Sequence, residues 1–147
     1  MESRKKDRNV LIRLYSSIRH PDQDEEKHEL TATGLLIEKA GKTYLKYEET
    51  QSDQQIQTIV KLDSEDALIM RRGAVNMRLP FMATGERVGS YESGPATFNL
   101  VVKTEELSFT EEEDNSGGRF NVNYELHAEG SLLGTYKLTI TYTEGTL

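Results

Sequence analysis

Hydrophobic and polar residues alternate along most of this chain. Between residues 9 and 19, Val10, Ile12 and Leu14 occupy every second position, and mostly polar side chains fall between them. Because successive side chains of a strand point to opposite faces, this pattern predicts a strand with one buried face. Only residues 62–70 suggest a single helical turn, which Asp63 or Ser64 would cap.

The same alternation recurs in separate segments up to the end of the chain. Turn residues divide the segments, among them Gly41, which allows the positive φ of a tight hairpin. Pro80 lacks an N–H group, so we expect its strand to end there or to lie at an edge. The alternation changes phase between Val102 and Leu107, which predicts a β-bulge near residues 104–106.

The apolar faces of these segments define the expected core. Side chains at alternate positions share one face, so burial of the apolar face leaves the polar positions outside. The residues expected in the core are Val10, Ile12, Leu14, Leu45, Tyr47, Val60, Leu62, Val75, Met77, Phe98, Leu100, Val102, Val122, Tyr124, Leu126, Leu138 and Ile140. The residues expected outside are Arg13, Asn76, Asn121, Asn123, Lys137 and Thr139.

The number and spacing of the segments predict the fold. About eight to ten strands follow one another with short turns, which is typical of an antiparallel meander. The first strand (residues 10–19) and the last (residues 135–143) would aggregate as open edges, so we expect them to pair. The sequence therefore predicts an all-β protein, an up-and-down antiparallel β-barrel of about eight to ten strands. One domain would cover residues 1–147, with residues 1–8 as a flexible N-terminal tail.

Two segments carry a resemblance to a known family. One is RRGAVNMRLPF at residues 71–81, an Arg-Arg-Gly turn followed by a strand, and the other is YESGP at residues 91–95, which leads into the last strands. With them the chain, from Val10 to Tyr142, resembles the YwiB-like family of uncharacterised bacterial proteins. The resemblance implies a lipocalin-like β-barrel of the calycin type, and it implies no established activity.

Composition and charge exclude several classes of protein. Without Cys, the chain has no disulfide framework, thiol nucleophile or iron–sulfur cluster. The formal net charge of −7 opposes binding to polyphosphate backbones, so we expect no general affinity for nucleic acid. The apolar stretch at residues 10–12 ends at Arg13, too early for a secretory signal, and no window reaches the length of a membrane span. We therefore expect a cytoplasmic protein with no membrane partner.

The chain offers no recognisable catalytic or metal-binding pattern. Its histidines, His20, His28 and His127, form no metal-binding pair such as H-x-x-x-H. The segment GSYESG at residues 89–94 lacks the G-x-S-x-G spacing of a nucleophile elbow. We therefore expect no enzyme activity, no catalytic residues, no metal site and no cofactor.

Three arginines are the best candidates for ligand binding. Arg71 and Arg72 precede a glycine turn and Arg78 lies on the returning strand, so their guanidinium groups could converge across one hairpin. Guanidinium groups bind a carboxylate or phosphate through paired hydrogen bonds. Together with Tyr91 and Tyr124 they form the expected binding site, and the expected partner is a small apolar or anionic ligand.

Two functions are compatible with these predictions. A barrel of about eight strands has room for side chains or for one small ligand, so the first hypothesis is a non-catalytic barrel that binds a small ligand. The alternative is an interaction module, in which side chains fill the barrel and the loops or an Arg-rich rim bind a protein or nucleic acid. An interior cavity would favour the first hypothesis and a filled interior the second. Nothing in the pattern indicates an oligomeric state.

Overall fold

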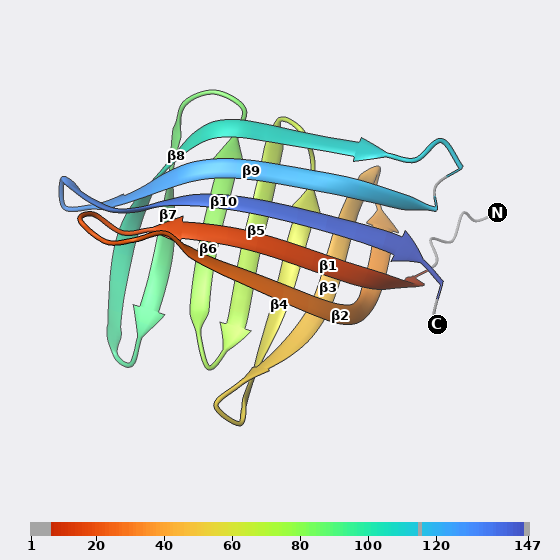
Figure 1. The fold of residues 1–147 in the computed structure, drawn as a ribbon, viewed down its shortest axis with the longest axis horizontal. Helices are drawn as coiled ribbons and strands as arrows, with labels where there is room; N and C mark the ends of the chain where they lie inside the picture. Colours follow the sequence, from red (N-terminus) through yellow and green to blue (C-terminus); the bar gives the residue numbers. More distant parts are fainter. Residues whose placement is uncertain (1–6, 115, 146–147) are drawn as a thin grey trace.

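The chain forms a closed barrel of antiparallel strands, each paired with its neighbours in sequence (Figure 1). The computed structural model describes residues 7–114 and 116–145, and in this part of the chain it has ten strands and no helix. The predicted all-β, up-and-down barrel is therefore confirmed. The strands are β1 (Arg8–Arg19), β2 (Glu26–Lys39), β3 (Lys42–Gln51), β4 (Gln54–Leu62), β5 (Asp66–Gly73), β6 (Asn76–Met82), β7 (Glu86–Ser93), β8 (Ala96–Glu111), β9 (Gly117–Ala128) and β10 (Ser131–Glu144).

The first and last strands close the barrel. β1 pairs with β10 in a continuous antiparallel ladder, from the Val10/Glu144 pair to the Arg19/Thr135 pair. The ladder satisfies the backbone N–H and C=O groups of both strands, so neither is left as an edge. Figure 1 shows β1, β10 and β9 side by side, crossing in front of β3 to β7. The predicted pairing of the first and last strands is confirmed.

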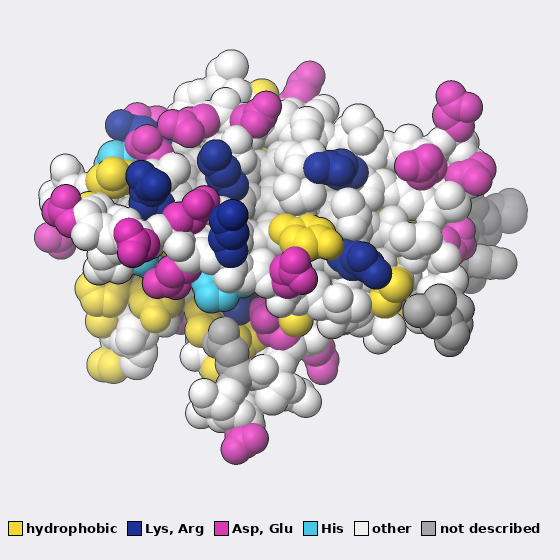
Figure 2. All heavy atoms as spheres, viewed as in Figure 1, with side chains coloured by type: hydrophobic (Ala, Val, Ile, Leu, Met, Phe, Trp, Pro, Cys, Tyr) yellow, Lys and Arg dark blue, Asp and Glu magenta, His cyan; other side chains and the backbone are white. Residues whose placement is uncertain are grey.

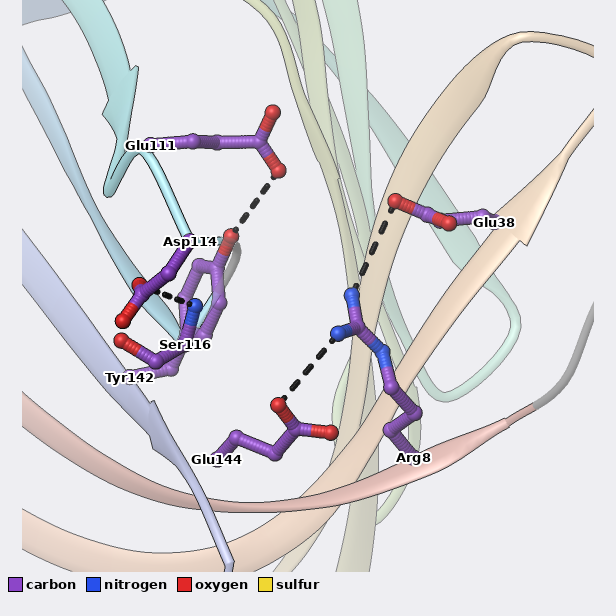
Figure 3. Close-up of polar contacts among 7 residues, drawn as sticks. All are labelled: Arg8, Glu38, Glu111, Asp114, Ser116, Tyr142 and Glu144. Atoms are coloured by element: carbon purple, nitrogen blue, oxygen red, sulfur yellow. Dashed lines mark hydrogen bonds and ion pairs between the residues drawn. The ribbon is translucent and has the colours of Figure 1, made fainter.

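Polar side chains bridge the closure at the end of the barrel where β1 begins and β10 ends, here called the terminal end (Figure 3). The Arg8 guanidinium lies 3.5 Å from the Glu144 carboxylate of β10 and 3.7 Å from the Glu38 carboxylate of β2. The Tyr142 hydroxyl donates to Glu111 at 3.4 Å. Of the predicted N-terminal tail, residues 1–6 lie outside the described residues, whereas Arg8 is the first residue of β1.

Side chains fill the half of the barrel nearest the terminal end. Its largest fully buried side chains come from six strands and include aromatic and branched residues. Close packing of this kind is typical of a protein interior. These side chains are Ile12 of β1, Leu36 of β2, Leu45 of β3, Phe81 of β6, Phe120 of β9 and Ile140 of β10.

The predicted core is largely confirmed, with one clear error. Most of the expected residues are buried, while Leu14, Val75, Met77 and Leu138 are half-buried. Phe98 is 48% exposed. It does face inward, because it shares the face of Leu100 and Val102, but it lies next to the β7–β8 turn, where the barrel is open. Figure 2 shows hydrophobic side chains gathered over this hairpin, at the lower left.

The expected outward positions are also confirmed. Arg13, Asn76 and Lys137 are exposed on the outer surface of their strands. Asn121, Asn123 and Thr139 are half-buried there, because their side chains make hydrogen bonds across neighbouring strands. The alternation of the sequence therefore assigns the two faces of the sheet correctly.

Three local predictions have different outcomes. The register of β8 against β9 shifts between Thr104 and Glu106, which confirms the predicted bulge. β6 continues through Pro80, but its pairing with β7 stops at Arg78, so the missing N–H group lies where that ladder has ended. The predicted helical turn is wrong. The Asp63 carboxylate accepts the backbone N–H groups of Glu65 and Asp66 and forms a turn between two strands.

Candidate functional site

The half of the barrel opposite the terminal end contains a cavity of about 430 Å³. Because the strands form a meander, the β1–β2, β3–β4, β5–β6, β7–β8 and β9–β10 turns all lie at this end, here called the open end. Apolar side chains cover most of the cavity wall, including Leu14 and Leu30 on one side and Ile69 and Met77 on the other. One cluster of polar residues lies on β3, β4, β5 and β9: Tyr47, Glu49, Thr58, Arg71 and Tyr124. Further polar residues line the cavity from β1, β2 and β10: Ser16, Ser17, His28, Glu29, Tyr136 and Lys137.

Strand register brings several of these residues into one row. Directly paired residues of neighbouring strands point to the same face of a sheet. Tyr47 pairs with Thr58, Thr58 with Arg71, and Arg71 with Met77. Met77 then pairs with Tyr91, and Tyr91 with Phe98. The row crosses β3 to β8 on the inner wall, so Arg71 lies in the middle of an interior surface.

An ion pair lies within this surface. The Arg71 Nη2 atom donates a hydrogen bond of 2.8 Å to the Glu49 Oε1 atom. The Arg71 and Glu49 side chains are only 24% and 18% exposed, so solvent screens the pair weakly. This is the only hydrogen bond or ion pair of the Arg71 side chain in residues 7–114 and 116–145. Since a guanidinium has five N–H donors, most of its donors have no partner among these residues.

Two tyrosine rings lie on either side of the arginine. Burial, with a smaller contribution from the Glu49 carboxylate, raises the pKa of Tyr47 to about 12, and Arg71 acts in the opposite direction. Burial, followed by the neighbouring Tyr136, also raises the pKa of Tyr124, again opposed by Arg71. Both hydroxyl groups therefore keep their protons at neutral pH and can donate hydrogen bonds.

The Tyr124 ring is fixed by its neighbours. It stacks on the Tyr136 ring at a centroid distance of 5.0 Å and an interplanar angle of 7°. It also contacts the Phe81 ring, tilted by 57° at 4.8 Å. Such aromatic contacts add about 0.5–1.5 kcal/mol each beyond simple burial. The hydroxyl group of Tyr124 is thus held in place at the cavity.

Thr58 adds an unsatisfied hydroxyl group to the same wall. Its side chain is 2% exposed. The Oγ1 atom lies near the Tyr47 hydroxyl, yet it makes no hydrogen bond of normal geometry with any residue that the structure describes. A buried hydroxyl without a partner costs about 1–3 kcal/mol, so the site favours something that supplies one.

The five residues predicted from the sequence to bind a ligand divide into three groups. Arg71 and Tyr124 both line the cavity. Tyr91 faces inward beside Met77 and stacks on Phe98 at 6.3 Å, outside the cavity lining. Arg72 and Arg78 lie on the outer surface, in a groove of about 330 Å³ that Arg71 also lines. The three guanidinium groups do not converge, because neighbouring positions on a strand face opposite ways and Arg78 pairs with outward Met70.

Sequence reasoning missed most polar residues of the cavity, among them Tyr47, which was expected only as a core residue, Glu49, Thr58 and Tyr136. The signal for Glu49 and Thr58 lies in the register of β3, β4 and β5, which places both beside Arg71. Alternation within one strand carries no information about register, so these residues could not be found from it.

One histidine, His28 of β2, lines the cavity and lies 3.5 Å from the Glu26 carboxylate, whereas the other two make contacts elsewhere. The His20 ring contacts the Leu133 carbonyl at 3.1 Å, and the His127 ring contacts the Glu125 carboxylate at 2.9 Å. Among residues 7–114 and 116–145, no group of three or more His, Cys, Asp or Glu side chains could hold a metal ion. In the same part of the chain, the structure contains no helix of the length and apolarity needed to cross a membrane.

Comparison with known proteins gives one family. The family model described as "Domain of unknown function (DUF1934)" matches residues 12–140. The "Uncharacterized beta-barrel protein YwiB" of Bacillus subtilis (strain 168) is 31% identical over 130 residues, which cover 88% of this chain and 90% of that protein. The crystal structure of the ywiB protein from Bacillus subtilis matches with a TM-score of 0.82 and 28% identity, over 95% of this chain and 94% of that one. The chain, a closed β-barrel like its relative, therefore belongs to the DUF1934 family.

Proposed function

We propose that this protein is a non-catalytic binding protein that holds a small ligand inside its barrel. The cavity of about 430 Å³ carries this proposal. Pockets for small molecules usually measure about 300–1,000 Å³ and combine apolar walls with a few polar groups. The cavity combines both kinds of side chain, since Leu14, Leu30 and Met77 are apolar and Arg71 is charged.

The proposal of binding without catalysis is supported by the titratable groups beside Arg71. A general acid or base works best when its pKa lies near the working pH. Burial moves the pKa values of Tyr47 and Tyr124 further from neutrality. Glu49 forms an ion pair with Arg71. These groups are suited to donating or accepting fixed hydrogen bonds.

Native mass spectrometry of the protein purified from its own organism tests the proposal. We expect a small molecule bound to the wild-type protein and lost from Leu14→Trp, because Leu14 lines the cavity and the larger ring would fill it. Arg13→Trp is the matched control, since Arg13 is exposed on the outer surface next along β1. It should keep the bound molecule.

The same measurement separates the alternative, an interaction module acting through its rim. That function would place the essential residues outside, at Arg72 and Arg78. If the Arg72→Ala/Arg78→Ala double variant lost its bound partner while Leu14→Trp kept it, the interior binding proposal would be overturned. A wild-type protein that carries no small molecule would also contradict it.

A further inference from the structure

The polar cluster around Arg71 offers several hydrogen-bond donors and one charged acceptor. Its donors are the remaining N–H groups of Arg71 and the hydroxyl groups of Tyr47, Tyr124 and Thr58. Its one charged acceptor, the Glu49 carboxylate, already binds Arg71. Buried donors without partners are costly, so the cluster fits a ligand that brings acceptors.

We propose that the cavity takes a single-chain amphiphile with a carboxylate head, which Arg71 binds together with the Tyr47 and Tyr124 hydroxyl groups. This inference rests on the proposed binding function and specifies its ligand class. The planar guanidinium matches a carboxylate, since two parallel N–H groups can reach its two oxygens. The buried hydroxyl of Thr58 lies on the same wall, paired in register with both Tyr47 and Arg71.

The charges already present in the site favour a ligand with one negative charge over a ligand with two. Glu49 already places one carboxylate 2.8 Å from the guanidinium. A carboxylate ligand would bring a second negative charge to a single arginine, and a phosphate dianion would bring a third within a poorly solvated cavity. Like charges in such surroundings repel strongly, so a carboxylate fits the site better than a phosphate.

The apolar side chains on the opposite wall of the cavity fit a hydrocarbon chain. β1, β2 and β10 contribute polar residues, among them Ser16 and His28, and also the apolar side chains of Leu14, Ile18, Leu30 and Leu138. These side chains face the cluster across the barrel and are only half-buried, so they gain most from contact with an apolar ligand. The head would therefore lie against β3, β4 and β5, and the chain along β1, β2 and β10.

Calorimetry on the full-length protein tests this inference with three amphiphiles. They have the same chain length and differ in the charge of the head group. The probes are decanoate, decanol and decyltrimethylammonium. We expect decanoate to bind most tightly. Arg71→Gln should weaken decanoate binding about tenfold or more and change decanol binding little, because a hydrogen bond to a charged group is lost. Arg72→Gln makes the same charge change one residue along, on the outer surface, and should leave decanoate binding within about twofold.

A substitution of Glu49 should change the decanoate affinity in the opposite direction. Glu49→Gln removes the carboxylate beside the ligand head, so decanoate should bind more tightly than to the wild type. If Arg71→Gln proves unstable because Glu49 is left without its partner, the Arg71→Gln/Glu49→Gln double variant removes both charges. Its decanoate affinity should still fall well below that of Glu49→Gln alone.

The outcomes separate this inference from the binding function on which it rests. Equal affinity for decanoate and decanol, or equal effects of Arg71→Gln and Arg72→Gln, would overturn the carboxylate ligand and leave a binding barrel intact. If no probe binds but the natural protein carries another small molecule, the carboxylate ligand is likewise overturned and the binding function stands. If no probe binds and the natural protein is empty, both proposals fail.

Discussion

At the residue scale, a single ion pair gives the barrel interior its chemical character. Arg71 and Glu49 lie on inner faces of β5 and β3 and are bonded at 2.8 Å. Among the residues that the structure describes, the other arginines of the β5–β6 hairpin, Arg72 and Arg78, are in no ion pair. The inward arginine of this hairpin thus adds an ion pair to the barrel interior, whereas the two outward arginines do not.

Alanine variants of these arginines should differ in stability. Arg71→Ala leaves the Glu49 carboxylate poorly solvated and without its partner, so we expect the free energy of unfolding to fall by about 1–3 kcal/mol. Arg78→Ala removes an exposed side chain and should change it by no more than about 0.5 kcal/mol. Urea denaturation of both variants measures the difference. Equal losses would mean that Arg78 is also part of a buried ion pair.

Tyr47 makes stability depend on alkaline pH. Its pKa is raised to about 12 in the folded protein, whereas an unfolded tyrosine has a pKa of about 10. Below pH 10 both states hold the proton. Between about pH 10 and pH 12 only the unfolded state releases it, so the free energy of unfolding falls as pH rises, by an amount of the order of 2 kcal/mol.

The variant Tyr47→Phe isolates this contribution. It keeps the ring but has no proton to lose, so its unfolding free energy should fall less between about pH 10 and pH 12. Tyr15→Phe is the control, because Tyr15 is exposed on the outer surface. Urea denaturation across this range provides the measurement. Identical pH profiles for the wild type and Tyr47→Phe would show that Tyr47 titrates as an ordinary tyrosine.

At the scale of strands, the sequence predicts which face of a strand points inward better than it predicts which residues pair between strands. Alternation identified the inward side of β1, β6 and β9, and the phase change near Thr104 located the bulge of β8. It could not predict that Thr58 pairs with Arg71, because register depends on the turns and on packing across the barrel. For this reason the predicted binding residues include Arg71 and Tyr124 of the cavity wall but not Glu49 and Thr58. Phe98 was misplaced because its exposure depends on which end is open.

β6 and β7 have the shortest ladder of the barrel and depend on Gly89. Their pairs run only from Asn76/Glu92 to Arg78/Ser90. Gly89 is buried, and an added Cβ would press against the backbone carbonyl oxygen of Arg78. Because neither the backbone nor Pro80 beside it can yield easily, we expect Gly89→Ala to lower the free energy of unfolding by about 1–3 kcal/mol. Ser90→Ala, one residue along, should cost much less, and chemical denaturation of both variants tests this.

At the scale of the whole molecule, the barrel is divided into a packed half and a hollow half. Phe81, Phe120 and Leu36 fill the terminal end, where Arg8 bridges β2 and β10. The open end holds the cavity and the half-exposed Phe98. Packing at one end stabilises the closed sheet, and this allows the other end to stay hollow without losing its shape.

This division predicts an unusual pattern of amide hydrogen exchange. Strands at chain ends usually fray and exchange quickly. Here β1 and β10 join in a ladder that runs from Val10/Glu144 to Arg19/Thr135, and their packed half contains fully buried Ile12 and Ile140. We therefore expect the amides around Ile12 and Ile140 to be among the slowest to exchange, and those of β7, with its short ladder to β6, to exchange faster. Exchange measured by mass spectrometry on peptic fragments decides the matter. If the first and last strands exchanged as fast as the hairpin turns, the barrel would open at its β1–β10 seam in solution, and the cavity would have no fixed wall.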